Sequence, residues 1–420
     1  MAEKKHTLIT NFFSLGIVQA ITSLLQLVVI PYVIARIGVD GFGVIAVAQV
    51  VMFFLASFTD YGFNQTATRD VVLHKTDQLQ LSRIFFRVLF SKIILCFVSF
   101  VVLLFLLWLI PVFHHHALLY LLAFVFVGGQ CLLVNWFFQG LEHMRFLAII
   151  GLVARLLFAA LVFLFIRDKN DDILFLFFLG LGNLVAALVS IFVAFRISRL
   201  QFMLPSWAAV IREFKEGWPI MLSNLSMNAC QYANLFILRL FTNDLITGYY
   251  SIAERIFFTL RQALVIFSQV AYPRVCQLVQ EGGARVAGFF RRFYVPFLGV
   301  VMAVAILVFI FSEPLLTFFT GHEHAGAAWI LRMFAIVLVI VCLNIPGTLL
   351  LLATDRKKSY FTVYMLGMVV NILFNITLVY FFGVTGTIGA IFITEIFITA
   401  GVTREIRRYS ELTKTQFKPG

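Results

Sequence analysis

The sequence has too few charged residues to cover the surface of a soluble domain. Only 12% of its 420 residues are charged, 62% are hydrophobic, and the mean hydropathy is +1.00. Soluble globular proteins carry about twice that charged fraction. This scarcity excludes an ordinary soluble fold and leaves an integral membrane protein as the class to test.

Extramembrane domains and cofactor motifs are missing as well. No connection between the apolar runs is long enough to fold by itself or to build a catalytic domain. The five cysteines are scattered without metal-ligand spacing, and no glycine-rich phosphate loop with a following Lys-Ser or Lys-Thr occurs. We therefore expect a protein that is not an enzyme and has no metal site or cofactor. It would draw on a proton or sodium gradient, or on consumption of its product, instead of ATP.

What the sequence does contain is one apolar run after another. A helix needs about 20 residues to cross a bilayer, and twelve stretches are long and apolar enough. They are residues 11–34, 42–62, 84–110, 117–138, 147–166, 173–195, 218–241, 248–273, 293–318, 326–352, 360–382 and 386–403. The sequence therefore predicts an all-α integral membrane protein with twelve transmembrane helices.

Positive charge is concentrated in alternate connections between these runs. On one side the connections hold only Arg36, Arg167 and Lys169, whereas most of the 32 Lys and Arg residues fall on the other side. Basic connections stay in the cytoplasm, so both termini are predicted to be cytoplasmic and the protein to lie in the bacterial inner membrane. The net charge of +12 then faces anionic membrane lipid, and nucleic acid is not expected as a partner.

The two halves of the chain resemble each other. A division near residue 210 leaves six predicted spans on each side, which forms a parallel repeat. We place the N-terminal six-helix bundle at residues 1–205 and the C-terminal bundle at 206–420, around a central cavity.

The first span of each half carries a polar stripe. Residues at spacings of four and seven share one helix face, and an unpaired amide in hydrocarbon costs several kcal/mol. The stripes therefore either bond to neighbouring helices or line the cavity; their match between the halves favours the cavity and a substrate-binding role. They consist of Gln19, Ser23 and Gln26 in one half and of Asn224, Asn228 and Gln231 in the other.

Basic residues also lie within the predicted spans. A central Arg costs about 3 kcal/mol on insertion scales, so it needs a partner or a watery cavity. Arg239 is near the end of its span and is expected to snorkel. Lys92 lies at an intermediate depth. The candidates for binding an anionic substrate in the cavity are Arg155, Arg261 and Arg332, with Arg255 as a weaker one.

Acidic residues within the spans are fewer. Glu254 and Arg261 are seven apart on one face, so an ion pair between them is one interpretation. The remaining excess of positive charge would attract an anion, such as a phosphate-bearing solute or a phospholipid-like glycolipid. Glu395 is the first candidate for proton coupling and Glu254 the second; the alternative for Glu395 is a hydrogen bond to a neighbouring helix.

Three motifs resemble those of a known transporter family. Residues 59–70, TDYGFNQTATRD, are similar to the signature of bacterial O-antigen flippases of the Wzx type, with Asp60, Asn64 and Arg69 as its polar residues. Residues 38–44, GVDGFGV, and 216–224, EGWPIMLSN, also resemble that family. It is a polysaccharide transporter family of the multidrug/oligosaccharidyl-lipid/polysaccharide exporter superfamily, and the resemblance covers essentially the whole chain.

The resemblance implies a function. The expected cargo is an undecaprenyl-pyrophosphate-linked oligosaccharide, the O-antigen repeat unit, moved from the cytoplasmic to the periplasmic leaflet by alternating access for lipopolysaccharide biosynthesis. The expected partners are this cargo, membrane lipid and other polysaccharide-assembly proteins.

Three other functions each require features that can be checked in the sequence. A drug/cation antiporter of the same superfamily should have acids in its first or seventh span, and neither span has one. A membrane glycosyltransferase or polysaccharide polymerase needs an outer catalytic loop. A major-facilitator carrier should have a Gly- and Arg-rich second-to-third loop, which this chain lacks.

Overall fold

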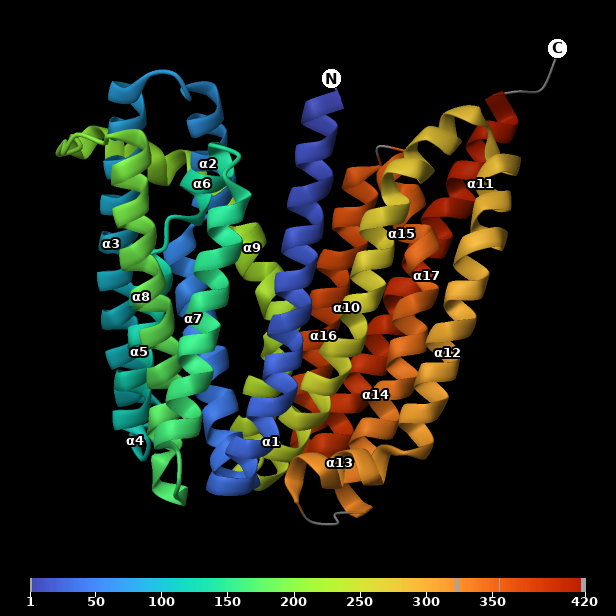
Figure 1. Ribbon diagram of the computed structural model, residues 1–420. Helices are drawn as coiled ribbons and strands as arrows, with labels where there is room; N and C mark the ends of the chain where they lie inside the picture. The colour runs from blue at the N-terminus through green and yellow to red at the C-terminus, as the bar shows by residue number, and fades with distance from the viewer. Residues whose placement is uncertain (1, 322–324, 355, 417–420) are drawn as a thin grey trace. The chain divides into compact units, whose positions relative to one another are not determined.

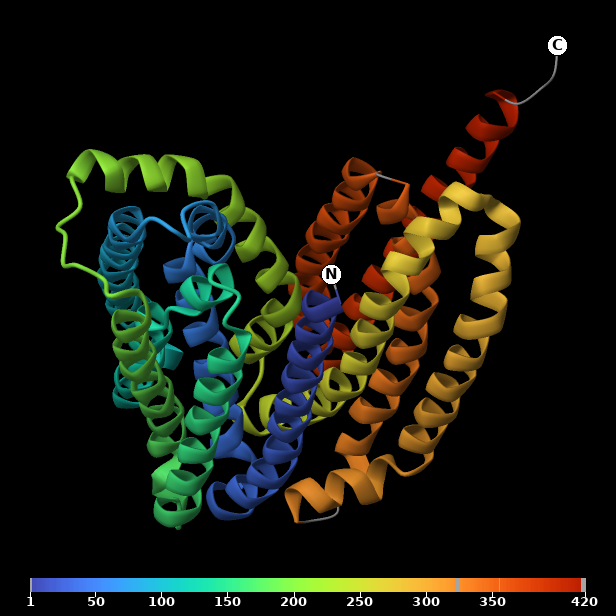
Figure 2. The same ribbon diagram turned by 45° about the horizontal axis from the view of Figure 1, so that its top comes forward.

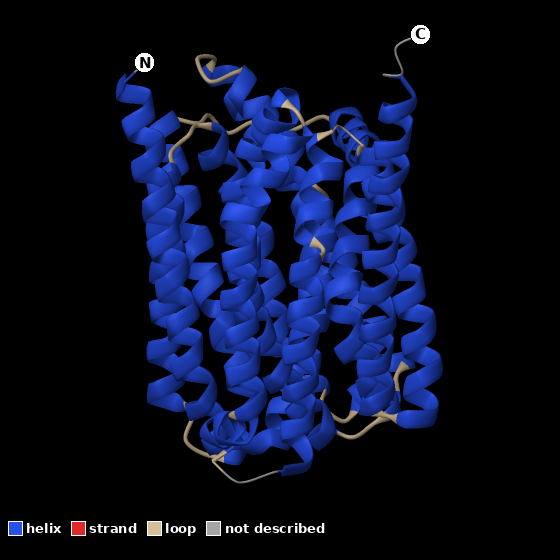
Figure 3. Cartoon of the chain, turned by 90° about the vertical axis from the view of Figure 1, so that its right-hand side faces the viewer, coloured by secondary structure: helices blue, strands red, loops and turns tan. Residues whose placement is uncertain are grey.

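The described part of the chain is built from helices and short connections (Figure 1). The computed structural model describes residues 2–321, 325–354 and 356–416. Side chains are described for most of these residues, with 2–24, 26, 27, 226–231 and 408–416 among the exceptions. Figure 3 shows helix and loop only, and no strand occurs in these three ranges. The all-α prediction is confirmed.

The chain forms two compact units, Met1–Tyr232 and Ala233–Gly420. The division falls within one helix, α9 (Trp207–Phe241), and the predicted boundary at 205/206 stays a prediction. The other helices of the first unit are α1 (Ala2–Asp60), α2 (Phe63–Leu73), α3 (Gln78–Leu109), α4 (Pro111–His114), α5 (Ala117–Leu132), α6 (Asn135–Gly140), α7 (Met144–Phe165), the 3-10 turn η1 (Lys169–Asp171) and α8 (Asp172–Ser198). Those of the second unit are α10 (Asp244–Glu281), α11 (Gly283–Phe289), the π-helical turn η2 (Phe290–Tyr294), α12 (Val295–Ile310), α13 (Ser312–Thr320), α14 (Ala325–Leu343), α15 (Ile345–Ala353), α16 (Lys357–Phe382) and α17 (Val384–Gln416).

All twelve predicted ranges lie mainly on helix, but they are not twelve separate apolar helices. Among the described residues, eight helical stretches are long and apolar enough to cross a membrane. The 46-residue stretch Val28–Leu73 contains the end of the first predicted span and all of the second. Residues 147–166 fall mainly on the shorter apolar helix Ile149–Phe165, and 218–241 fall partly on Tyr232–Phe241. The range 248–273 lies on α10, whose Glu254, Arg255 and Arg261 reduce its hydropathy.

A glycine divides α1. Gly38 has φ +85° and ψ 168°, outside the helical region, and an added Cβ would meet Asp40 Oδ1 at 2.6 Å. Only glycine adopts this backbone without strain. The chain therefore turns from one helix to the next within the GVDGFGV run, whereas Pro31 lies inside the preceding helix.

The first unit has an aromatic core. Phe63, Phe85, Trp136 and Phe137 are fully buried. The Phe85 ring lies 5.9 Å from Trp136 and 5.3 Å from Phe137, centroid to centroid, in tilted and edge-on arrangements. Lipid is as apolar as these side chains, so close packing and ring geometry, more than exclusion of water, hold α2, α3 and α6 together.

Helices α5 and α8 approach each other through two glycines. A Cβ on Gly129 would lie 2.8 Å from the backbone nitrogen of Leu184, and one on Gly180 would lie 2.9 Å from the carbonyl carbon of Val125. Neither obstacle is a flexible side chain. Small residues at such positions let two membrane helices pack backbone to backbone.

The basic connections of each unit gather at one end. In the second unit, Figures 1 and 2 show α11 and the C-terminal end of α17 at the same end, with α13 at the opposite one. In the first unit, α2 lies at the opposite end from α4 (Figure 1). This arrangement agrees with the alternation of charge along the sequence.

Substituting Gly129 by Ala should destabilise the first unit. The new methyl group would collide with the α8 backbone, and overpacking of this kind costs about 1–3 kcal/mol. The neighbouring Gly128→Ala is the matched control, because a Cβ there meets nothing within 4 Å. Thermal unfolding in detergent should show a lower midpoint for G129A alone; equal midpoints for the two variants would refute the close contact.

Candidate functional site

A buried lysine of α3 lies beside Asp60, the last residue of α1. Lys92, on α3, is only 2% exposed, and its Nζ lies 3.6 Å from Asp60 Oδ1. The ammonium also donates to the carbonyl oxygen of Gln130 (3.3 Å). Asn64 Nδ2 donates to Asp60 Oδ2 (3.0 Å), which holds the carboxylate in place. A charge removed from water needs such partners, because its desolvation otherwise costs several kcal/mol.

A second cation joins three helices. Arg87, on α3, forms ion pairs with Asp70 of α2 (Nη2–Oδ2, 2.8 Å) and with Glu213 of α9 (Nε–Oε2, 2.7 Å). Glu213 is 8% exposed. The guanidinium donates a hydrogen bond to Asp70, and its contact with Glu213 is an ion pair. The pair of contacts fixes the start of α9 to the first unit.

Two glycines, Gly62 and Gly217, allow close contact between α9 and the residues that follow α1. Gly62 has φ +84°, and a Cβ there would lie 2.9 Å from Ile220 Cβ. A Cβ on Gly217 would lie 3.0 Å from the Tyr61 ring. The Tyr61 hydroxyl donates to the carbonyl oxygen of Phe214 (3.2 Å). These contacts and the two cations form one signature cluster: Asp60, Tyr61, Gly62, Asn64, Asp70, Arg87, Lys92 and Glu213.

The second unit has its own polar cluster, on α10, α16, α17 and the α14–α15 junction. Glu395 Oε2 accepts a hydrogen bond from Asn344 Nδ2 (3.2 Å). The positive charge of Arg261 acts on both Glu395 and Tyr364. The Tyr364 hydroxyl lies 3.0 Å from Thr348 Oγ1. A carboxylate, a guanidinium and neutral donors thus meet in the interior of this unit.

Glu254 has different neighbours from those considered in the sequence. It is 7% exposed, and the Tyr250 hydroxyl donates to its Oε1 (3.2 Å). The charge that acts on it is that of Arg255, the next residue along α10. No ion pair between Glu254 and Arg261 occurs among the described residues, so that interpretation is not confirmed; the charge of Arg261 acts on Glu395.

The remaining basic candidates are placed as follows. Arg332 Nε donates to Ser312 Oγ (2.8 Å), and its guanidinium lies 6.0 Å from the Phe309 ring centroid. Arg239 forms ion pairs with Asp244 in the α9–α10 turn, with a closest distance of 2.6 Å. Arg155 is half-buried on α7 of the first unit.

The structure describes the side chains of only some residues of the two polar stripes. Asn224 is half-buried on α9, and Arg69 is exposed on α2. The other stripe residues lie on helical backbone, but their side chains are outside the described part: Gln19, Ser23 and Gln26 on α1, and Asn228 and Gln231 on α9. The cavity between the bundles, with these residues as its lining, stays a prediction.

A further polar stripe was missed in the sequence. Asn371 Nδ2 donates to Thr394 Oγ1 (3.2 Å), and Asn375 Nδ2 donates to Asn234 Oδ1 (2.7 Å). The two asparagines are four apart on α16, which was the available signal. No such spacing marks the partners of Lys92 and Glu213, because these partners come from other parts of the chain.

The fold is similar to that of two solved transporters. An inward-facing multidrug resistance transporter of the MATE family matches with a TM-score of 0.70 and 16% identity, over 94% of this chain and 96% of its own. The lipid II flippase MurJ, in an inward closed conformation, matches with a TM-score of 0.73 and 13% identity, over 94% and 87% of the two chains. At these identities the similarity shows a common fold.

Sequence relatives cover nearly the whole chain. A protein of Shigella dysenteriae and one of Escherichia coli K12, both named as O-antigen transporters, are each 23% identical. The first alignment covers 94% of this chain and 99% of the relative, the second 95% and 97%.

A family model agrees with these relatives. The model described as polysaccharide biosynthesis protein matches residues 8–279, which include the signature cluster and α9. This multi-pass helical membrane protein belongs to the polysaccharide biosynthesis protein family.

Proposed function

We propose that the protein is a flippase for an undecaprenyl-pyrophosphate-linked oligosaccharide, the O-antigen repeat unit. It would move this lipid from the cytoplasmic to the periplasmic leaflet of the bacterial inner membrane, with twelve spans and both termini in the cytoplasm. The observation that carries the proposal is the end-to-end match to two proteins named as O-antigen transporters. The fold shared with a lipid II flippase supports it.

The charges inside the helices suit a pyrophosphate-bearing cargo. Arg155, Arg261 and Arg332 lie within helices that carry few acids, and a guanidinium binds phosphate oxygens in a two-pronged contact. Arg261 is our first choice, because its charge acts on Glu395, which Asn344 holds in the polar cluster of the second unit. In this mechanism Glu395 keeps Arg261 neutralised until the cargo phosphate replaces the carboxylate.

Helix α9 would couple the two units during alternating access. Its first part is fixed in the first unit by Glu213 and by the close approach of Gly217 to Tyr61. Its last part belongs to the second unit, where Asn234 bonds to Asn375. A continuous helix held at both ends transmits a rotation of one unit to the other. The signature cluster would therefore serve transport as an anchor and would not touch the cargo.

Deletion of the gene tests the proposal. Undecaprenyl-linked repeat units should accumulate on the cytoplasmic leaflet, where a membrane-impermeant probe added to spheroplasts does not reach them. Restoring the gene should return them to the outer leaflet. Repeat units that still reach the periplasmic leaflet in the deletion strain would contradict a flippase function.

Substituting Arg261 by Ala should abolish surface polysaccharide while the protein remains in the membrane. Arg261→Lys should restore part of it, because the charge survives and the two-pronged phosphate contact is lost. Arg274→Ala is the matched control, since Arg274 lies on the same helix but is exposed and bonds to Gln277. Normal polysaccharide from R261A, measured by gel electrophoresis of lipopolysaccharide, would sink the assignment.

Proton coupling should depend on Glu395. Its carboxyl lies within α17, bonded to Asn344 and influenced by Arg261, so a proton gained there would release Arg261 for cargo. Flux in reconstituted vesicles should rise with an imposed pH gradient for the native chain and ignore it for Glu395→Gln. A native flux that also ignores the gradient would show that protons do not drive transport.

Loss of Arg87 should weaken the anchor of α9. Arg87→Ala leaves Asp70 and Glu213 without their counter-charge, which costs about 1–3 kcal/mol for partly exposed groups. Arg83→Ala, on an exposed position of the same helix, serves as the control. R87A should lower both the midpoint of thermal unfolding in detergent and cargo flux. Behaviour identical to that of R83A would mean that the ion pairs do not anchor the helix.

A further inference from the structure

An open cavity lies between α14 and α17 in the second unit. Thr399, in its lining, donates to the backbone carbonyl oxygen of Glu395 (2.7 Å), so the cavity begins about one helical turn from the polar cluster around Glu395. The volume of the cavity is about 1060 Å³. Ligand pockets for small organic molecules measure about 300–1,000 Å³, so the cavity is too large for a lone phosphate. The lining residues are Ile340 of α14 and Ile396, Thr399, Ala400, Thr403, Arg404, Glu405 and Arg407 of α17.

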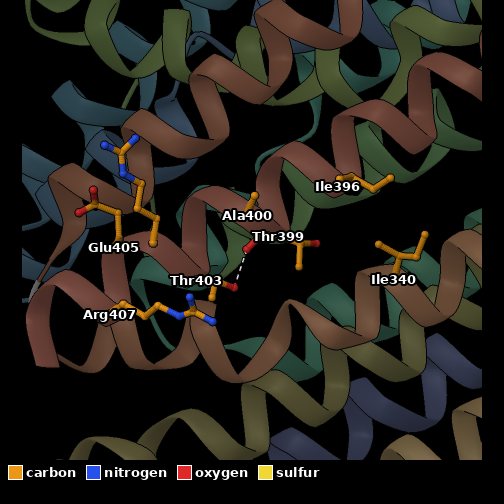
Figure 4. Close-up of a pocket in the computed structure, with 8 residues that line it drawn as sticks. Ile340, Ile396, Thr399, Ala400, Thr403, Glu405 and Arg407 are labelled. Carbon is orange, nitrogen blue, oxygen red and sulfur yellow. Dashed lines mark hydrogen bonds between the residues drawn. The ribbon is translucent and has the colours of Figure 1, made fainter.

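The lining changes character along the cavity. Figure 4 shows Ile340 and Ile396 together at one end, and Glu405 and Arg407 at the other. Ile396 is 58% exposed, so an apolar chain could cover it. Arg404 and Arg407 are both exposed and are three residues apart on one helix. This gradient from isoleucine to arginine matches an anionic amphiphile whose tail lies in the bilayer.

The polar end offers acceptors as well as donors. The two guanidinium groups can donate to phosphate oxygens. Thr403 Oγ1 donates to the carbonyl oxygen of Thr399 (2.7 Å; Figure 4), so the lone pairs of this cavity-lining hydroxyl remain able to accept. The Glu405 carboxylate is a further acceptor. A carboxylate beside a phosphate site is unfavourable unless the ligand also brings hydroxyl donors, and sugars provide them.

We propose that this cavity binds the headgroup of a prenyl-pyrophosphate-linked saccharide, with Arg404 and Arg407 on the pyrophosphate, Glu405 on a sugar hydroxyl and Ile340 and Ile396 against the start of the prenyl chain. The inference rests on the proposed function and adds Arg404 and Arg407, near the end of α17, to the arginines proposed to bind the cargo. An ordinary anionic phospholipid is the competing occupant. A phospholipid headgroup supplies phosphate oxygens for the two arginines but fewer hydroxyl donors for Glu405 than a saccharide does.

Native mass spectrometry of the full-length protein from detergent micelles can test the site. The probes are undecaprenyl pyrophosphate carrying one N-acetylhexosamine, bare undecaprenyl pyrophosphate, and phosphatidylglycerol. R404Q/R407Q should weaken binding of both prenyl probes by about tenfold or more, because charge-assisted hydrogen bonds are lost. R291Q/R292Q removes the same charge from exposed positions elsewhere in the second unit and should leave binding unchanged. I396W should block both prenyl probes by filling the apolar end.

The sugar contact has its own test. E405Q should weaken the glycosylated probe and leave bare undecaprenyl pyrophosphate unaffected. Native binding by R404Q/R407Q, or displacement of the glycosylated probe by an equal amount of phosphatidylglycerol, would overturn the site. If repeat units accumulate in the deletion strain while R404Q/R407Q binds normally, the cavity assignment fails and the flippase proposal stands. Absence of accumulation would refute the function itself, whatever the cavity binds.

Discussion

The cost of placing a charge in hydrocarbon governs this structure. Every ionic side chain that enters an apolar helix needs a counter-charge, a hydrogen bond or water, because insertion otherwise costs several kcal/mol. Lys92 meets this requirement with Asp60 and a carbonyl oxygen, and Glu395 with Asn344 and Arg261. Several of these charges gather into one cluster in each unit, whereas Glu254 and Arg332 have hydrogen-bond partners of their own.

The two clusters have different consequences. The signature cluster consists of paired charges and close glycine contacts, all within the first unit, and it holds the beginning of α9. The cluster around Glu395 combines one acid, one base and neutral donors, so a single proton or a phosphate would rearrange it. The signature cluster is suited to holding α9 rigidly, and the cluster around Glu395 is suited to exchanging its ionic partners. Under the proposed mechanism the protein needs both properties, and α9 runs from one unit into the other.

Helix positions followed from the sequence, but the partners of the charges did not. Apolar runs of about 20 residues predict helices directly, and the break between the predicted spans 11–34 and 42–62 coincides with the turn at Gly38. The Arg87–Glu213 ion pair joins residues far apart in the chain, so no local spacing of residues predicts it. The same holds for Arg261, whose helical spacing pointed to Glu254 while tertiary packing placed it by Glu395.

Translocation by the purified protein tests the central claim most directly. Vesicles would carry fluorescent undecaprenyl-pyrophosphate oligosaccharide, and a membrane-impermeant glycosidase outside would cleave only what reaches the outer leaflet. The account predicts that protein-containing vesicles expose the inner-leaflet pool and that a prenyl saccharide without the pyrophosphate is moved far more slowly. Equal exposure in vesicles without protein, or equal rates for the two lipids, would contradict a flippase that recognises its cargo through charge.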